Sequence, residues 1–211
     1  MRSPRRPRGG PRHLDARRRQ ILGGAARCFA RNGFHGTSMQ DVLHEVGLSA
    51  GAVYRCFSGK DDLIAAIAGE AVSSVRQAFE EAARVNPPPT ADVRIGRVTR
   101  TLLSGEGRGM DRRAHSGLIV QVWSETLRSE RPAATLGEAY GGLRLAWAEL
   151  VEVYRESGVP AADVPSDHVA RTLIATAQGF IVQPAMFGDA APEVLENGLR
   201  GLMSMDLQKI S

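Results

Sequence analysis

The segment from Leu48 to Leu63 combines small side chains with hydrogen-bond donors that suit a phosphate-rich surface. Residues 49–52 read Ser-Ala-Gly-Ala, and small side chains allow a helix backbone to approach a partner closely. Tyr54, Arg55 and Lys60 follow, with a phenol, a guanidinium and an ammonium group. These groups donate hydrogen bonds to phosphate oxygens, and arginine also donates to guanine edges. The residue types therefore indicate recognition of an anionic partner rather than bond-breaking chemistry.

The sequence carries no catalytic or metal-binding pattern. The five histidines are scattered without an HExxH motif, and Cys28 and Cys56 lie outside any CxxC spacing. There is no GxSxG motif, and the glycine-rich residues 105–110 lack the Lys-Ser/Thr ending of a phosphate-binding loop. We therefore predict no catalytic residue, no metal site and no cofactor, so the protein is not expected to be an enzyme.

Helical periodicity runs through almost the whole chain, which predicts an all-α fold. Ser38 and Asp41 have the spacing of a capping box, and Gly47 permits a sharp turn before a second short helix that Ser49 starts. Two helices joined in this way form a helix-turn-helix, here over residues 38–57. Its second helix enters the DNA major groove. The residues predicted to contact DNA are Thr37, Ser38, Ser49, Ala50, Gly51, Val53, Tyr54, Arg55 and Lys60.

Three of these side chains have structural alternatives that the sequence leaves open. Tyr54 could be half-buried in the core, Lys60 could be an ordinary surface lysine, and Arg55 fits a solvated helix face equally well.

Arginine supplies most of the basic character of the chain. The net charge is +4, and the first nineteen residues hold eight arginines and one acid. Residues 1–13 are rich in Arg, Pro and Gly, cannot bury a core, and are predicted to form a disordered arm. Such an arm could be a solvated tail, or it could touch phosphates or enter a minor groove.

The segment from Phe29 to Leu63 resembles the DNA-binding domain of the TetR family of bacterial transcription regulators. It reads FARNGFHGTSMQDVLHEVGLSAGAVYRCFSGKDDL, and the resemblance covers roughly residues 14 to 65. Leu43, Val46 and Cys56 depart from the residues usual in the family. The resemblance implies a homodimer that binds a palindromic operator in double-stranded DNA, most often as a repressor. It also implies an unidentified small-molecule effector that releases the DNA.

The resemblance further implies how the chain is divided. The expected parts are the arm (1–13), a helix-turn-helix domain (14–60) and a helical ligand-binding and dimerisation domain (61–211), linked by a helix over about 60–85. Two helices, about 166–187 and 191–205, are expected to pair with those of a second subunit. The candidate pocket residues are His115, Trp123, Tyr140, Trp147 and Gln178, although each also fits an apolar core stripe.

One alternative to a DNA-binding regulator remains open. The chain could be a helical carrier or interaction module whose motif no longer binds DNA. No apolar run is long enough to cross a bilayer, and no signal-peptide pattern stands at the start, so a cytoplasmic location without membrane contact is expected.

Overall fold

The computed structural model describes residues 11–83, 89–104, 109–156, 164–188 and 191–204. The described residues form α-helices and contain no strand, which confirms the predicted all-α fold. Helix α1 begins at Pro11, so residues 11–13 are helical rather than part of the predicted disordered arm, and residues 1–10 lie outside the described residues. The helices are α1 (Pro11–Gly36), α2 (Met39–Val46), α3 (Ala50–Tyr54), α4 (Lys60–Ala83), α5 (Ala91–Leu103), α6 (Arg112–Glu125), α7 (Glu130–Glu156), α8 (Ser166–Phe187) and α9 (Pro192–Met203).

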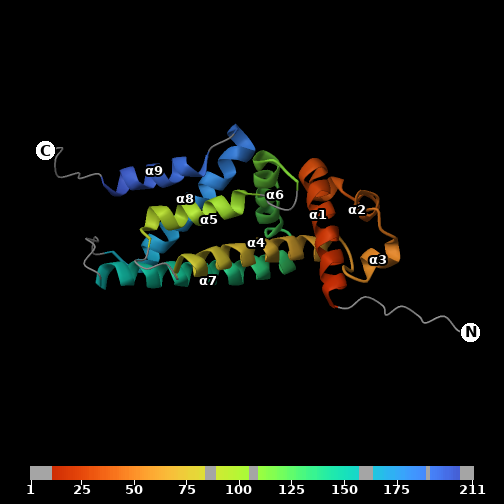
Figure 1. The fold of residues 1–211 in the computed structure, drawn as a ribbon, viewed down its shortest axis with the longest axis horizontal. Coiled ribbons are helices and arrows are strands. Elements are labelled where there is room, and N and C mark those ends of the chain that lie inside the picture. The colour runs from red at the N-terminus through yellow and green to blue at the C-terminus, as the bar shows by residue number, and fades with distance from the viewer. Residues whose placement is uncertain (1–10, 84–88, 105–108, 157–163, 189–190, 205–211) are drawn as a thin grey trace, which may run out of the picture.

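Helices α1 to α3 form a small unit at one end of an elongated molecule (Figure 1). Phe29 lies at the centre of this unit, fully buried, with its ring 4.7 Å from that of Phe34 in an edge-to-face arrangement. Edge-to-face aromatic pairs add specific attraction to the burial of apolar area. The first buried residues of α4, Leu63 and Ile64, belong to the same core, so α4 is anchored in the small unit where it begins.

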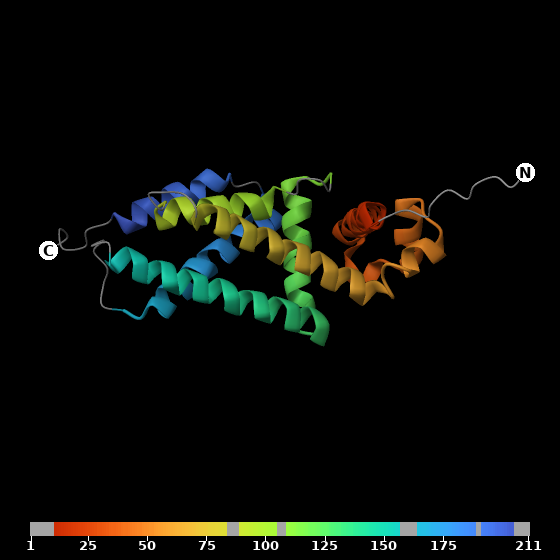
Figure 2. The ribbon, with the colours of Figure 1, turned by 60° about the horizontal axis from the view of Figure 1, so that its bottom comes forward.

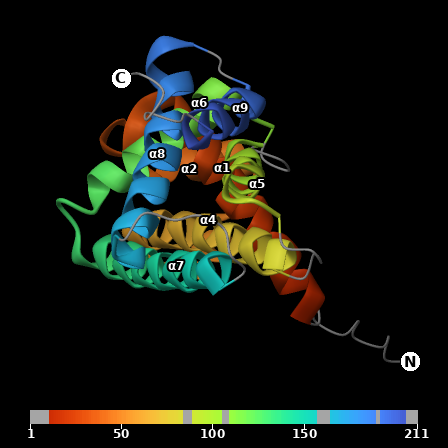
Figure 3. The ribbon, with the colours of Figure 1, turned by 90° about the vertical axis from the view of Figure 1, so that its left-hand side faces the viewer.

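The remaining helices form the body of the molecule. Helix α4 leaves the small unit and runs alongside α7, while α6 stands across α4 near the junction (Figures 1 and 2). Helices α5 and α9 pack together, and α8 crosses between that pair and α7 (Figure 3). Ile95, Trp147, Ile174 and Ile181 lie in the core of the body. Helices α4 and α6 therefore both connect the body to the small unit.

Candidate nucleic-acid interface and ligand cavity

The helix-turn-helix consists of α2, the turn of residues 47–49, and α3. The hydroxyl of Ser38 accepts a hydrogen bond from the amide of Asp41 at 3.2 Å. The carboxylate of Asp41 accepts one from the amide of Ser38 at 2.8 Å, and this bond lowers the pKa of Asp41. These two bonds confirm the predicted capping box. Gly47 ends α2 at φ 64°, a left-handed conformation that suits glycine and turns the chain toward α3.

Helix α1 supports α2 at very close range. A Cβ atom built on Gly24 would lie 2.3 Å from Cγ1 of Val46, so only glycine allows the two helices to approach this closely. The side-chain amide of Gln20 donates to the Val46 carbonyl at 3.1 Å, which satisfies one of the open carbonyls at the end of α2.

Two arginines of α1 hold the same end of α2 through Glu45. Arg27 and Arg31 each donate to the Glu45 carboxylate, at 2.7 and 2.6 Å. Their hydrogen bonds, that of Arg27 foremost, hold the pKa of Glu45 below its ordinary value. The position of α2, and with it that of α3, is therefore fixed from α1 by packing and by charge.

The outer face of α3 carries small and polar side chains. Ser49, Ala50 and Gly51 are exposed, and a Cβ at Gly51 would meet no atom within 4 Å. Tyr54 is 48% exposed, and Arg55 is exposed with its Nε donating to the Gly51 carbonyl at 2.9 Å. The small side chains leave the start of α3 open, and a phenol and a guanidinium are exposed at its end. These five residues are all exposed, as contact with a nucleic acid would require.

Two of the residues predicted to contact DNA do not reach the surface, and those predictions are corrected. Val53 is 0% exposed because it packs in the core of the small unit. Thr37 is 2% exposed, and its hydroxyl donates to the carbonyls of Gly33 at 2.8 Å and Cys28 at 3.2 Å. Both residues hold the helix-turn-helix together from inside.

Lys60 and Ser38 already have intramolecular partners. The Lys60 ammonium donates to the carbonyls of Phe34 at 2.7 Å and Thr37 at 3.3 Å, which ties the start of α4 to the end of α1. An ammonium has three donors, so one remains for a phosphate. The exposed Ser38 hydroxyl donates to the Asp41 carboxylate at 2.7 Å. Contact of either residue with DNA stays a prediction.

Arg18 of α1 lies beside the end of α3, a placement that sequence reasoning missed. Its guanidinium carbon is 4.4 Å from the centre of the Phe57 ring, and Nη1 donates to the Cys56 carbonyl at 3.4 Å. The arginine run at residues 17–19 signalled a basic helix start, but nothing in the sequence indicated which arginine would stack on Phe57.

A cavity of about 1250 Å³ lies in the body, with walls from α4 to α8. Ligand pockets of proteins usually measure about 300–1,000 Å³, so this one has room for a bulky small molecule. Trp123 of α6, Tyr140 and Trp147 of α7 and Gln178 of α8 all line it, and the structure thus brings together four of the five predicted pocket residues. We call this space the effector cavity.

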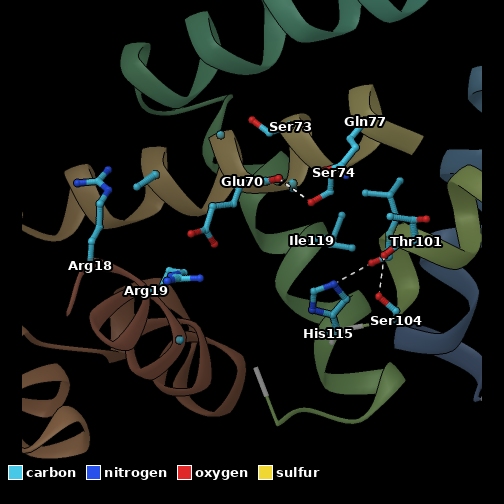
Figure 4. Close-up of a pocket in the computed structure, with 15 residues that line it drawn as sticks. Arg18, Arg19, Glu70, Ser73, Ser74, Gln77, Thr101, Ser104, His115 and Ile119 are labelled. Atoms are coloured by element: carbon cyan, nitrogen blue, oxygen red, sulfur yellow. Dashed lines mark hydrogen bonds between the residues drawn. The ribbon is translucent and has the colours of Figure 1, made fainter. Parts of the chain in front are cut away.

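His115 is the exception among the predicted pocket residues. It is buried on α6 with Nε2 2.8 Å from the Leu102 carbonyl, and it does not line the effector cavity. It lines a second depression of about 710 Å³, between α1, α4 and the α5–α6 pair (Figure 4). We call this depression the junction groove. Its walls include Arg19, Glu70, Ser73, Thr101, Leu102 and His115.

A polar contact that sequence reasoning missed joins the small unit to the body. Nη1 of Arg128, in the turn before α7, lies 2.9 Å from Nε2 of His35 near the end of α1. Glu125, at the end of α6, lies 3.8 Å from the same ring nitrogen. No motif marks these residues, because the contact forms only when distant parts of the chain fold together.

Two other features, a membrane-spanning helix and a metal site, are absent from the described residues. None of the helices there has both the length and the apolar character needed to cross a membrane. The described His, Cys, Asp and Glu side chains form no group of three that could hold a metal ion.

Comparison with known proteins points to one family. Residues 21–67 match the family described as bacterial regulatory proteins, tetR family. The HTH-type transcriptional repressor Rv1474c of Mycobacterium tuberculosis is 44% identical over 64 residues, which are 30% of this chain and 34% of that protein. This chain thus spans about a third of the length of that relative. The HTH-type transcriptional regulator UidR of Escherichia coli is 25% identical over 187 residues, 88% of this chain and 90% of UidR.

Solved structures extend the likeness over nearly the whole chain. Salmonella enterica GusR superposes with a TM-score of 0.70 at 27% identity and covers 90% of this chain and 96% of its own. A transcriptional regulator from Saccharomonospora viridis, solved in complex with choline, has a TM-score of 0.72 at 21% identity. The match covers 91% of this chain and 97% of that protein. Rv1474c, UidR and the Saccharomonospora viridis protein are named as transcriptional repressors or regulators. The helix-turn-helix, the helical body and these similarities support a regulator of the tetR family of bacterial regulatory proteins, whose model residues 21–67 match.

Proposed function

We propose that this chain is a homodimeric transcriptional repressor that binds a palindromic operator and releases it when a small molecule binds. The observation that carries the proposal is the exposed face of α3, where Ser49, Ala50 and Gly51 leave the helix start open and Tyr54 and Arg55 are exposed at its end. Such a face fits the major groove. Relatives named as repressors and regulators support the same function. We place its action in the cytoplasm.

In this proposal the exposed residues divide the work of DNA recognition. The backbone at Ala50 and Gly51 approaches the base edges, and Arg55 reaches a guanine or a phosphate. Ser49, Tyr54 and the third donor of Lys60 bind phosphates, which fixes the orientation of the helix on the duplex.

An apolar surface on α8 and α9 supports dimerisation. Met186 and Phe187, at the end of α8, and Val194, Leu202 and Met203 on α9 are all strongly exposed. Large apolar side chains exposed along two consecutive helices are what an interface between subunits would cover. A dimer places two copies of α3 on one DNA face, and half-sites one helical turn apart lie about 34–36 Å from each other.

The effector cavity supports the release step. Trp123, Tyr140 and Trp147 offer aromatic surface, and Gln178 offers a hydrogen-bond donor and acceptor that can orient a ligand. Helix α4 lines the cavity and also starts in the core of the small unit. A ligand that prefers the position of α4 in the DNA-free protein lowers the affinity for DNA. By linkage, bound DNA lowers the affinity for the ligand by the same factor.

The dimer is tested by sedimentation of single-charge variants. Phe187→Asp places a charge on a side chain that is 80% exposed in one subunit and should be buried between two. We expect the variant to sediment as a monomer and to lose DNA affinity. Leu127→Asp is the matched control, because Leu127 is 86% exposed but lies in the turn before α7. A dimeric Phe187→Asp protein would contradict the proposed interface.

The release step is tested through the two tryptophans, both of which line the effector cavity. Compounds that change tryptophan fluorescence are expected to release bound DNA. Gly142→Leu should weaken both effects, because Gly142 lines the cavity and a Cβ there meets no atom within 4 Å. Gly141→Leu is the control, since Gly141 is equally free of contacts but does not line the cavity. Equal behaviour of the two variants would contradict the assignment.

A further inference from the structure

The junction groove lies between two parts of the molecule that a regulator must move relative to one another. One wall comes from α1 of the small unit, and the others come from α4, α5 and α6 (Figure 4). At about 710 Å³ it falls within the usual size range of ligand pockets, about 300–1,000 Å³. We propose that the junction groove is a second small-molecule site, which adjoins the effector cavity through the shared residues Ser73, Leu102 and Ile119 and binds an amphipathic monocarboxylate.

The cationic end of the groove has unused hydrogen-bonding capacity. Within the described part of the chain, neither Arg18 nor Arg19 forms an ion pair, and Nε of Arg19 donates to the Asp15 carbonyl at 3.4 Å. Arg18 is held against the Phe57 ring, so Arg19 is the guanidinium that can turn toward a ligand. A guanidinium binds a carboxylate through two parallel hydrogen bonds, which gives both affinity and orientation.

The other walls determine the rest of the ligand. Leu102 and Ile119 line the groove, together with Ala66 of α4, and favour an apolar body. Ser73 and Thr101 also line it and can bind one neutral polar group. A fully polar anion would leave this apolar surface uncovered, so the groove favours a carboxylate that carries an apolar part.

Glu70 restricts the charge of the ligand. It lines the groove and extends from α4 toward Arg19 (Figure 4). Its carboxylate would repel a second carboxylate of a ligand, so the groove favours one carboxylate over two. Removing the glutamate charge should therefore tighten binding of a monocarboxylate.

A ligand in the groove touches α1 on one side and α4 to α6 on the other. It therefore stabilises one relative position of the small unit and the body, and changes DNA affinity by linkage. This regulatory consequence rests on the proposed repressor function, whereas binding in the groove does not. The two are separated by measuring binding first, without DNA.

Titration calorimetry on the full chain tests the site with 4-phenylbutyrate as the probe and neutral 4-phenylbutyramide as its matched partner. We expect the acid to bind at least about tenfold more tightly than the amide, because a charge-assisted hydrogen bond contributes at least that factor. Arg19→Gln should remove this preference. Arg17→Gln, which changes a neighbouring arginine outside the groove, should keep it. Glu70→Gln should bind the acid more tightly than the unmodified chain.

Two further variants keep the test decisive. Gly23→Leu narrows the groove from α1, where the nearest atom to a new Cβ is Nη1 of Arg27 at 3.7 Å, and should abolish binding even if Arg19→Gln fails to fold. Gly142→Leu, in the effector cavity, should leave acid binding unchanged. The proposal is overturned if the acid does not bind, if acid and amide bind equally, or if Gly142→Leu abolishes binding while Gly23→Leu does not.

Discussion

The close contact between α1 and α2 allows a prediction with a built-in control. Gly24→Ala would place a Cβ 2.3 Å from Cγ1 of Val46, whereas carbon atoms in good contact are about 3.5–4.0 Å apart. Helix α2 must therefore move away from α1 or distort. Inserting a carbon into a well-packed site of this kind costs about 1–3 kcal/mol.

Gly23→Ala, one position earlier, isolates that cost. Its Cβ would meet Nη1 of Arg27 at 3.7 Å, which is an ordinary contact. Both variants gain the same helix propensity, about 1 kcal/mol from Gly to Ala. The difference between their free energies of unfolding is therefore the packing cost alone, about 1–3 kcal/mol in favour of Gly23→Ala.

Urea denaturation followed by circular dichroism measures this difference. We also expect Gly24→Ala, but not Gly23→Ala, to bind DNA more weakly, because a shift of α2 carries α3 with it. Equal unfolding free energies for the two variants would refute the close approach of α1 and α2 and the argument that Gly24 positions α3.

Three further predictions concern the same end of the molecule. Tyr54→Phe should weaken DNA binding without changing the urea midpoint, because it removes only an exposed hydroxyl; a lowered midpoint would indicate a structural role. Glu45→Gln should reduce the loss of unfolding free energy that occurs as the pH falls into the acid range. Its pKa is depressed by Arg27 and Arg31, so its contribution is present above its ordinary pKa of 4.5 and lost as the pH falls through the depressed value. Deleting residues 2–12 should weaken binding to all duplexes alike and make the DNA affinity less dependent on salt concentration. Unchanged affinity would exclude contact between the arm and DNA.

Local sequence signals predicted the framework of the small unit. The Ser38–Asp41 capping box and the turn at Gly47 depend on residues close in sequence, and both occur as expected. The orientation of side chains on α3 was less predictable. A helix of five residues contains too little periodicity to separate an inward Val53 from an outward Tyr54, so Val53 was assigned to the wrong face.

Contacts between distant segments account for what sequence reasoning missed. The hydroxyl of Thr37 and the ammonium of Lys60 donate to backbone carbonyls at the end of α1. The position of a backbone carbonyl cannot be inferred from residue types. The junction groove likewise combines Arg19, Glu70 and His115 from three helices. The effector cavity was partly predicted, because its aromatic residues are few in this sequence and conspicuous within it.

The central claim is that two copies of α3 read a palindrome, and selection of duplexes from a randomised DNA pool tests it most directly. The purified full chain is mixed with the pool at near-physiological salt, and the bound duplexes are sequenced after several rounds. We predict an enriched palindrome whose half-sites lie about 34–36 Å apart, or a multiple of that spacing. Weak, salt-sensitive binding without any enriched sequence would contradict the claim and favour a helical carrier that does not read DNA.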